Sequence, residues 1–240
     1  MALFSGDGWL FFLRWFHFLA GITWIGMLYY FNFVQTPFFA SAEAPVRSGM
    51  VTGGLVERAL WWFRWGAMLT LVTGWLYLLH VMFARYGGVR EFLATAYGWK
   101  IMFGGLLGTL MWFNVWFIIW PAQQLVIASA RQVSKGGQAI PEAAARGQRG
   151  GFASRTNTML SIPMLFFMGS VHLGVADPTS PGQKIGALIL LAIVMIAAEA
   201  NALVGTTGAG KKLLSTLKGT FWGGFVLTAV LYFGLEILFP

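Results

Sequence analysis

Residues Ile185–Ala198 have the sequence IGALILLAIVMIAA, which contains no charged or polar side chain. A second apolar run, Phe221–Phe239, contains a single charged residue, Glu236. Runs of this length and composition are typical of helices that cross a lipid bilayer. The whole chain of 240 residues is 58% hydrophobic and 10% charged, whereas a soluble domain carries roughly 25% charged residues. We therefore predict an integral membrane protein.

Hydropathy, together with the positions of proline and glycine, divides the chain into six predicted spans. Each is long enough to cross a hydrocarbon core of ~30 Å. The sequence predicts one all-α transmembrane domain over residues 1–240, a polytopic bundle of about six helices. The spans are Trp9–Gln35, Arg58–Ala84, Tyr97–Trp120, Phe152–Leu173, Gln183–Val204 and Lys218–Phe239. Their limits are marked by Pro37, Gly87–Gly88, Pro121, Pro178, Pro181 and Gly205–Gly210.

The connection Ala122–Gly151 is the longest polar segment of the chain. We expect Gln123–Val133 to form an interfacial helix. The remainder is rich in glycine and arginine, and we expect it to be a mobile loop.

Lysine and arginine are distributed unevenly among the predicted connections. The first, third and fifth connections hold ten of them, and the second and fourth hold four. Because cytoplasmic loops carry an excess of positive charge, both termini are predicted to be periplasmic. The chain would then be a multi-pass protein of a bacterial inner (cytoplasmic) membrane. The same orientation accounts for the net charge of +8, so we expect no nucleic-acid partner.

The three histidines are the main candidate ligands, because the chain has no cysteine. Without cysteine, thiolate zinc sites, iron–sulfur clusters and covalently attached haem are excluded. His17 follows the start of the first span, and His80 and His172 precede the ends of the second and fourth. At a rise of ~1.5 Å per residue, all three lie within about 12 Å of the outer boundary. The alternative is that some are interfacial histidines, each hydrogen-bonded to a neighbouring helix.

Neutral imidazole is a good ligand for haem iron, copper or zinc. A haem b held between helices needs two axial ligands and room for a flat macrocycle. Gly21 lies one turn from His17, and Gly169 one turn from His172, so no side chain at those positions would strike a porphyrin. We therefore predict a haem b with His17 and His172 as axial ligands. His80 has larger neighbours; it would contact substrate or a propionate, or ligate a second metal centre.

Several further polar side chains lie in or near the predicted spans. Arg14, one turn outward of the first histidine, is expected to neutralise a haem propionate or, alternatively, to extend to the interface. Arg64 needs a carboxylate, carbonyl or anionic partner, and Glu199 is a candidate. Asn32, Gln35, Asn114 and Asn157 are expected to join helices through hydrogen bonds, and the alternative is a role in binding substrate.

The first span contains His17-Phe-Leu-Ala-Gly-Ile-Thr-Trp24-Ile-Gly26, followed by an aromatic run that includes Asn32. This pattern resembles the N-terminal membrane domain of the bacterial membrane-bound urate oxidases (urate hydroxylases). Trp61–Ala67 and Asn157–His172 are similar to the same family, so the resemblance covers most of the first four spans. The last two spans match only in character. A weaker likeness is to small haem-b membrane proteins that oxidise protoporphyrinogen.

The resemblance implies a membrane enzyme that hydroxylates urate to 5-hydroxyisourate, with electrons leaving through a C-terminal cytochrome c domain. The sequence ends at Pro240 and has no Cys-x-x-Cys-His motif. We therefore expect a separate periplasmic cytochrome c, or a neighbouring subunit in a homo- or hetero-oligomer, to accept the electrons.

The leading hypothesis is a haem-b-binding membrane redox protein that oxidises a small substrate, with urate as the first candidate. A second hypothesis is a non-catalytic cytochrome b-type subunit that relays electrons or anchors a larger membrane complex. A third is a transporter or channel with structural histidines.

Overall fold

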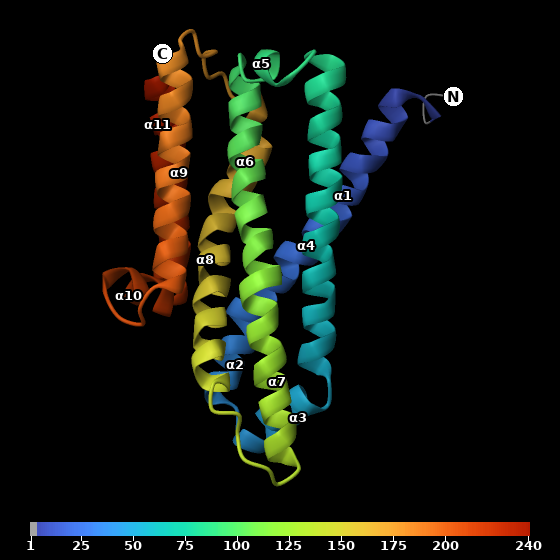
Figure 1. Ribbon diagram of the computed structural model, residues 1–240, viewed down its shortest axis with the longest axis vertical. Helices are drawn as coiled ribbons and strands as arrows, with labels where there is room; N and C mark the ends of the chain where they lie inside the picture. The colour runs from blue at the N-terminus through green and yellow to red at the C-terminus, as the bar shows by residue number, and fades with distance from the viewer. Residues whose placement is uncertain (1–3) are drawn as a thin grey trace.

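The computed structural model describes residues 4–240, and throughout that range the chain forms helices and short connections without a β-strand (Figure 1). The predicted all-α fold is therefore confirmed. The segments η2, η3 and η4 are π-helical turns, and η5 is a 3-10 turn. In chain order the elements are α1 (Gly6–Tyr29), η2 (Tyr30–Gln35), α2 (Thr36–Ser41), α3 (Ala44–Thr52), α4 (Leu55–His80), η3 (Val81–Arg85), α5 (Val89–Phe92), α6 (Ala96–Phe113), η4 (Asn114–Ile119), α7 (Trp120–Ser134), α8 (Ala143–Gly169), η5 (Ser170–His172), α9 (Pro181–Leu203), α10 (Ala209–Ser215) and α11 (Leu217–Leu238).

Five continuous helical runs within the described residues are long and apolar enough to cross a membrane. They are Gly6–Ser41, Leu55–Arg85, Ala96–Ser134, Pro181–Leu203 and Leu217–Leu238. The predicted fourth span corresponds to α8, which runs alongside the others (Figure 1). The first half of α8 contains three arginines, Arg146, Arg149 and Arg155, together with several polar residues. These residues lower its mean hydropathy, and α8 is not among the five runs.

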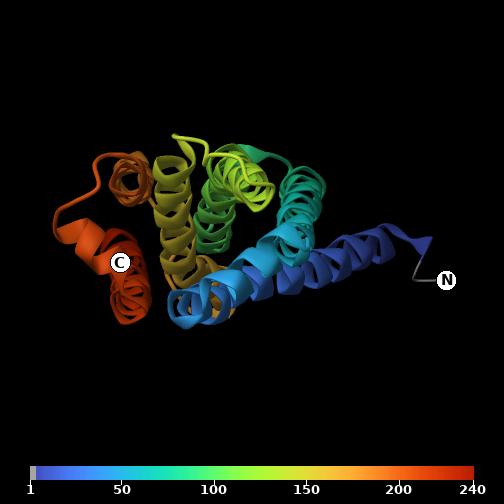
Figure 2. The same ribbon diagram turned by 90° about the horizontal axis from the view of Figure 1, so that it is seen from below.

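Figure 2 shows α1 extending outward from the bundle beside α4. The described chain begins in α1 and ends after α11 at the same end of the bundle (Figure 1). An even number of crossings would produce this arrangement. Which side of the membrane that end faces stays a prediction.

Glycines allow the neighbouring helices to approach one another closely. A Cβ at Gly66 of α4 would lie 3.1 Å from the backbone nitrogen of Trp24 in α1. A Cβ at Gly224 of α11 would lie 2.7 Å from the carbonyl oxygen of Met159 in α8. Small residues serve this purpose in membrane bundles, where dispersion and close packing drive association.

Two prolines that we expected to mark span limits lie inside continuous helical runs. Pro37 follows the π-helical turn η2, and Pro121 follows the π-helical turn η4. In these turns the N–H of Thr36 bonds to the carbonyl of Phe31, and that of Trp120 to Val115, five residues back. Because the wider turn changes which carbonyls are paired, the helix can continue through a residue without an N–H. The glycines at 87 and 88, Pro178 and the glycines from 205 do lie at breaks.

We predicted a mobile loop between Gln123–Val133 and Gly151. This prediction is wrong for its second half, because α8 already begins at Ala143. Two glycines of α8 lie against α7 there. A Cβ at Gly147 would be 3.0 Å from Val126, and one at Gly150 would be 3.0 Å from Ala122. The glycines therefore serve helix packing rather than loop mobility.

The centre of the bundle contains a buried hydrogen-bond network. The Asn114 side-chain amide donates to Asn157 Oδ1 at 3.0 Å and to Glu199 Oε2 at 3.0 Å, and Asn157 Nδ2 donates to the Met111 carbonyl at 2.8 Å. Asn114 and Asn157 are fully buried. Their hydrogen bonds join η4, α8 and α9, so the prediction that these asparagines connect helices is confirmed.

Arg64 does not pair with Glu199, so that candidate partnership is wrong. Its guanidinium carbon lies 4.0 Å from the ring centre of Trp120 and 5.0 Å from that of Trp116. The faces of these indoles stabilise the cation. Glu199 is occupied by Asn114, on another side of the bundle.

Asn157→Leu is expected to lower the free energy of unfolding by about 1–3 kcal/mol, because it leaves Asn114 and the Met111 carbonyl with fewer partners in a buried place. Unfolding of detergent-solubilised protein measures the change. Gln132→Leu, at an exposed amide of α7, is the control and should have little effect. Equal stability of the two variants would contradict the structural role of this network.

Candidate functional site

A cavity of about 370 Å³ lies between α1, α4, α6 and the end of α8. Of the predicted site residues, Arg14, His17 and His172 line it. The predicted residues Gly21, His80 and Gly169 are not among its lining residues. The full lining is Arg14, His17, Phe18, Trp24, Thr70, Leu71, Gly74, Trp75, Tyr77, Leu78, Tyr97, Ile101, Gly105, Gly108, Thr109, Met164, Met168, Val171 and His172.

The ring of His17 is fixed by the backbone of α4. Its Nδ1 lies 2.9 Å from the carbonyl oxygen of Thr70 and 3.5 Å from the hydroxyl of Thr73. A carbonyl oxygen can only accept, so Nδ1 carries the proton and donates it. In neutral imidazole the other nitrogen, Nε2, then has a free lone pair. This is the tautomer that metal-binding histidines adopt when a carbonyl orients them.

Gly74 makes the space that the imidazole occupies. A Cβ at this position would lie 2.8 Å from Cε1 of His17 and 3.0 Å from Nδ1. Gly21 and Gly169 lie one turn from a histidine in the same helical run, whereas Gly74 lies on the helix next to that of His17. No pattern within one helix could have identified it.

The other two glycines that line the cavity, Gly105 and Gly108, belong to α6. A Cβ at Gly105 would meet nothing within 4 Å, and one at Gly108 would come no closer than 3.8 Å to Met164. The spacing of three residues places both on one face of the helix. The spacing is visible in the sequence, but nothing within α6 alone connects it with the histidines.

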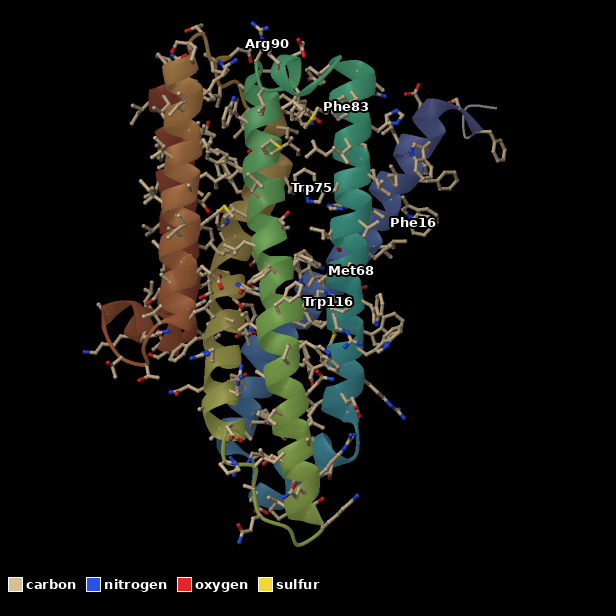
Figure 3. All side chains as sticks on the ribbon, viewed as in Figure 1. Phe16, Met68, Trp75, Phe83, Arg90 and Trp116 are labelled. Carbon is tan, nitrogen blue, oxygen red and sulfur yellow. The ribbon has the colours of Figure 1, made fainter. Side chains whose placement is uncertain are left out.

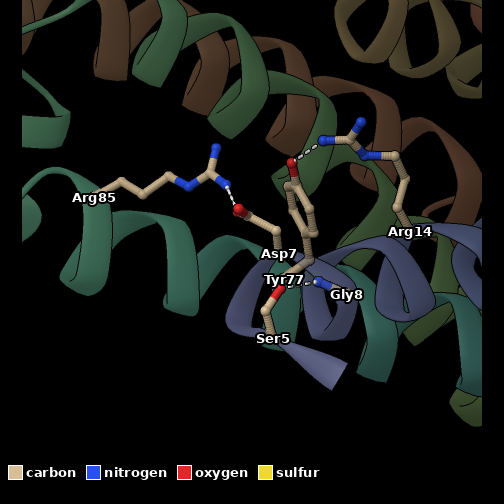
Figure 4. A network of polar contacts seen from close by, with 6 residues as sticks. All are labelled: Ser5, Asp7, Gly8, Arg14, Tyr77 and Arg85. Atoms are coloured by element: carbon tan, nitrogen blue, oxygen red, sulfur yellow. Dashed lines mark hydrogen bonds and ion pairs between the residues drawn. The ribbon is translucent and has the colours of Figure 1, made fainter. Parts of the chain in front are cut away.

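Arg14 and Tyr77 form the polar part of the lining. The Arg14 guanidinium donates a hydrogen bond to the Tyr77 hydroxyl and also lies over that ring, 5.0 Å from its centre (Figure 4). Near them, Arg85 pairs with Asp7 at 2.8 Å, which ties the start of α1 to η3. Because Arg14 has no acidic partner among the described ion pairs, its charge is available to an anion.

His172 is exposed and lies in η5, a short turn at the end of α8. The residues on both sides of it are held by Lys100, which is buried in α6. The Lys100 ammonium donates to the carbonyl of Val171 at 3.2 Å and to the carbonyl of Leu173. A buried cation therefore fixes the backbone that presents this imidazole.

His80 lies six residues beyond Gly74 on α4, about 120° around the helix from it. His80 therefore lies on a different face of α4 from Gly74, which explains why it does not line the cavity. In the described part of the chain, no three histidine or acidic residues form a group that could hold a metal ion. A three-histidine centre therefore has no support, whereas the pairing of His17 with His172 as ligands stays a prediction.

Gly21 lies at the contact between α1 and α4, where a Cβ would be 3.9 Å from Thr70. A Cβ at Gly169 would meet nothing within 4 Å. Neither glycine lines the cavity, so the room that we expected each to provide is supplied by Gly74, Gly105 and Gly108.

The remaining wall of the cavity is apolar and aromatic. Trp75 (labelled in Figure 3) donates its indole N–H to Thr109 at 3.0 Å, which joins α4 to α6 across the cavity. Met164 and Met168 contribute thioethers from α8. Cavities of roughly 300–1,000 Å³ with apolar walls and a few polar groups are typical sites for small molecules and cofactors.

Comparison with known proteins supports one family. The family model described as "Urate oxidase N-terminal" matches residues 82–233, which is more than half of the chain. The match includes His172, α9 and most of α11, although these last two helices resembled the family only in character. It begins after the motifs around His17 and Trp61–Ala67. Neither the curated proteins nor the solved structures include a significant match.

Gly74→Ala is expected to lower the free energy of unfolding by about 1–3 kcal/mol, because the new methyl group would overlap the His17 ring. Gly105→Ala, which adds the same methyl group to open space in the same cavity, is the matched control. It should leave stability unchanged or raise it by up to about 1 kcal/mol. Thermal unfolding in detergent measures both. If Gly74→Ala is tolerated as well as Gly105→Ala, His17 is not confined as described.

Proposed function

The chain belongs to the urate oxidase N-terminal family, and on that premise we propose that it is a haem-b-binding membrane redox protein that oxidises a small substrate. Urate is the first candidate substrate, in view of the family. A periplasmic cytochrome c, or a neighbouring redox subunit, would receive the electrons.

The observation that best supports this proposal is the state of His17. Its Nδ1–H is committed to the Thr70 carbonyl, 2.9 Å away, so Nε2 is left as a ligand on a ring that lines the cavity. Neutral imidazole with a fixed tautomer is the form that binds haem iron.

Several residues fit a haem in this cavity. His17 from α1 and His172 from η5 would hold the haem iron through their imidazole nitrogens. Met168 of α8 is the alternative second ligand, because thioethers also bind haem iron. The open faces at Gly105 and Gly108 leave space for a flat group against α6.

The remaining lining residues would bind and orient the organic groups. Arg14, together with the Tyr77 hydroxyl, would neutralise a carboxylate, either a propionate or an anionic substrate. Bound haem supplies one-electron redox chemistry. The apolar walls from Leu71, Ile101 and Met164 exclude water, which strengthens the interaction of Arg14 with an anion.

We expect purified protein to contain a bound haem b with a Soret band at about 410–430 nm. His17→Ala should lose most of this absorbance, because it removes the oriented Nε2. His80→Ala is the matched control and should keep it, since this imidazole lies outside the cavity. The measurement is the optical spectrum of oxidised and reduced protein, normalised to protein concentration.

A double His17→Ala, His172→Ala variant tests the ligand pair directly. If it retains haem, the assigned pair is wrong. If the His172→Ala single variant retains haem but Met168→Leu does not, methionine is the second ligand. Protein that binds no haem under any preparation would overturn the assignment of cofactor.

A catalyst and a non-catalytic cytochrome b-type subunit differ in turnover. Membranes that contain the protein should reduce added oxidised cytochrome c in the presence of urate, at a rate proportional to the haem content. Arg14→Gln should raise KM for an anionic substrate by about tenfold, the value of a charge-assisted hydrogen bond. If the haem can be reduced but urate does not reduce cytochrome c in these membranes, the electron-relay alternative is favoured.

A further inference from the structure

A second cavity, of about 260 Å³, lies toward the opposite end of α8 from the first. It is enclosed by η2, α4, η4, the start of α7, α8 and α10. Its polar lining includes Asn32, Gln35, Gln123, Gln148, Ser154 and Arg155. Nothing in the proposed redox function uses these residues.

Two atoms of this lining are buried without a hydrogen-bond partner. They are Nη1 of Arg155, which is a donor, and Oε1 of Gln35, which is an acceptor. The neighbouring amide of Asn32, by contrast, is satisfied by the Leu28 carbonyl and the Ser154 hydroxyl, both at 2.9 Å. Buried polar atoms without a partner cost about 1–3 kcal/mol each. Two such atoms in one cavity therefore indicate a missing ligand that can both accept and donate a hydrogen bond.

The charge of Arg155 is also uncompensated. None of the described residues that line the cavity is Asp or Glu, and the two ion pairs in the described chain involve other arginines. A guanidinium keeps its proton at all ordinary pH values, so it cannot avoid the cost of burial by becoming neutral. The bound partner should therefore be an anion.

The surroundings strengthen this positive potential. Lys211 of α10 is buried against Phe152, whose ring lines the cavity, with Nζ 4.3 Å from the ring centre. Burial, and then repulsion by the nearby Arg149, lower the pKa of Lys211. A second cation therefore lies directly behind the cavity wall and is itself in a positive environment.

We propose that this cavity is a binding site for a phosphate-type anion that also carries a hydrogen-bond donor. The anionic oxygens would accept from Arg155, and the donor would meet the Gln35 oxygen. Hydrogen phosphate has both groups, and so does a lipid phosphate whose headgroup is a primary amine. Gln148 and Ser215 are exposed at its edge, so the cavity is reached from the aqueous side.

The test uses the purified chain in nanodiscs of phosphatidylcholine, whose headgroup has no N–H or O–H donor. Inorganic phosphate is titrated against potassium chloride of equal ionic strength, and binding is measured by calorimetry and by the midpoint of thermal unfolding. We expect saturable binding of one phosphate. Arg155→Gln should weaken it by about tenfold or more. Arg146→Gln, an exposed arginine earlier on α8, is the matched control and should weaken it by no more than about twofold, because salt screens an exposed charge.

Gln35→Glu is the second variant, and it keeps the test informative if Arg155→Gln does not fold. It places a carboxylate in the cavity with Arg155. This variant should unfold at a higher temperature than the wild type without phosphate, and should no longer respond to phosphate.

A second arm identifies the source of the anion. The protein is placed in nanodiscs that contain phosphatidylethanolamine, without phosphate, and retained lipid is counted by native mass spectrometry. Retention of one lipid by the wild type but not by Arg155→Gln supports the headgroup as the ligand. The proposal is overturned if neither phosphate nor this lipid binds the wild type, or if Arg155→Gln and Arg146→Gln weaken binding equally. Both arms are independent of haem, so their failure would leave the proposed redox function intact.

Discussion

The structure depends on pairing polar groups inside a bundle whose outer surface faces lipid. Polar atoms without partners are costly there, since no water is available to replace a lost hydrogen bond. This problem is greatest for α8, in which the polar residues Asn157 and Ser161 are fully buried. Its neighbours solve it, through Asn114 from η4 and through the Tyr29 hydroxyl, 2.9 Å from Ser161. The polar face of α8 thus selects its neighbours in a way that apolar contact alone could not, because apolar side chains pack equally well against lipid.

At the two cavities, polar groups either bond outside their own helix or lack a hydrogen-bond partner. At one end, the Thr70 carbonyl bonds to the His17 ring in addition to its place in α4, and Gly74 leaves room for that ring. At the other end, Arg155 and Gln35 keep unpaired atoms that face a common space. One end therefore presents an oriented neutral base, and the other presents a fixed cation. α8 contributes residues to both cavities and keeps them apart.

The helical fold followed from the sequence because lipid permits few alternatives, and apolar length alone identifies most of the spans. Local patterns were less reliable. Pro37 and Pro121 suggested helix ends, but π-helical turns carry the helix through them, and such turns have no clear sequence signature. The depth of the histidines could be counted along each helix, and it brought His17 and His172 to one cavity. The direction of His80 and the partners of Arg64 and Gly74 depend on neighbouring helices, which one sequence does not place.

The run Ala96–Ser134 is unbroken for 39 residues, which corresponds to about 58 Å of helix. A hydrocarbon core of ~30 Å contains only about half of that length. The rest lies outside the hydrocarbon core. Part of it packs beside α3 and the polar first half of α8, where Arg131 pairs with Glu57 at 2.5 Å. The helices thus extend beyond the hydrocarbon core mainly at one end of the bundle. At the end of the bundle away from His17 and His172, the helices therefore extend past the hydrocarbon core and carry charged residues such as Arg131 and Glu57.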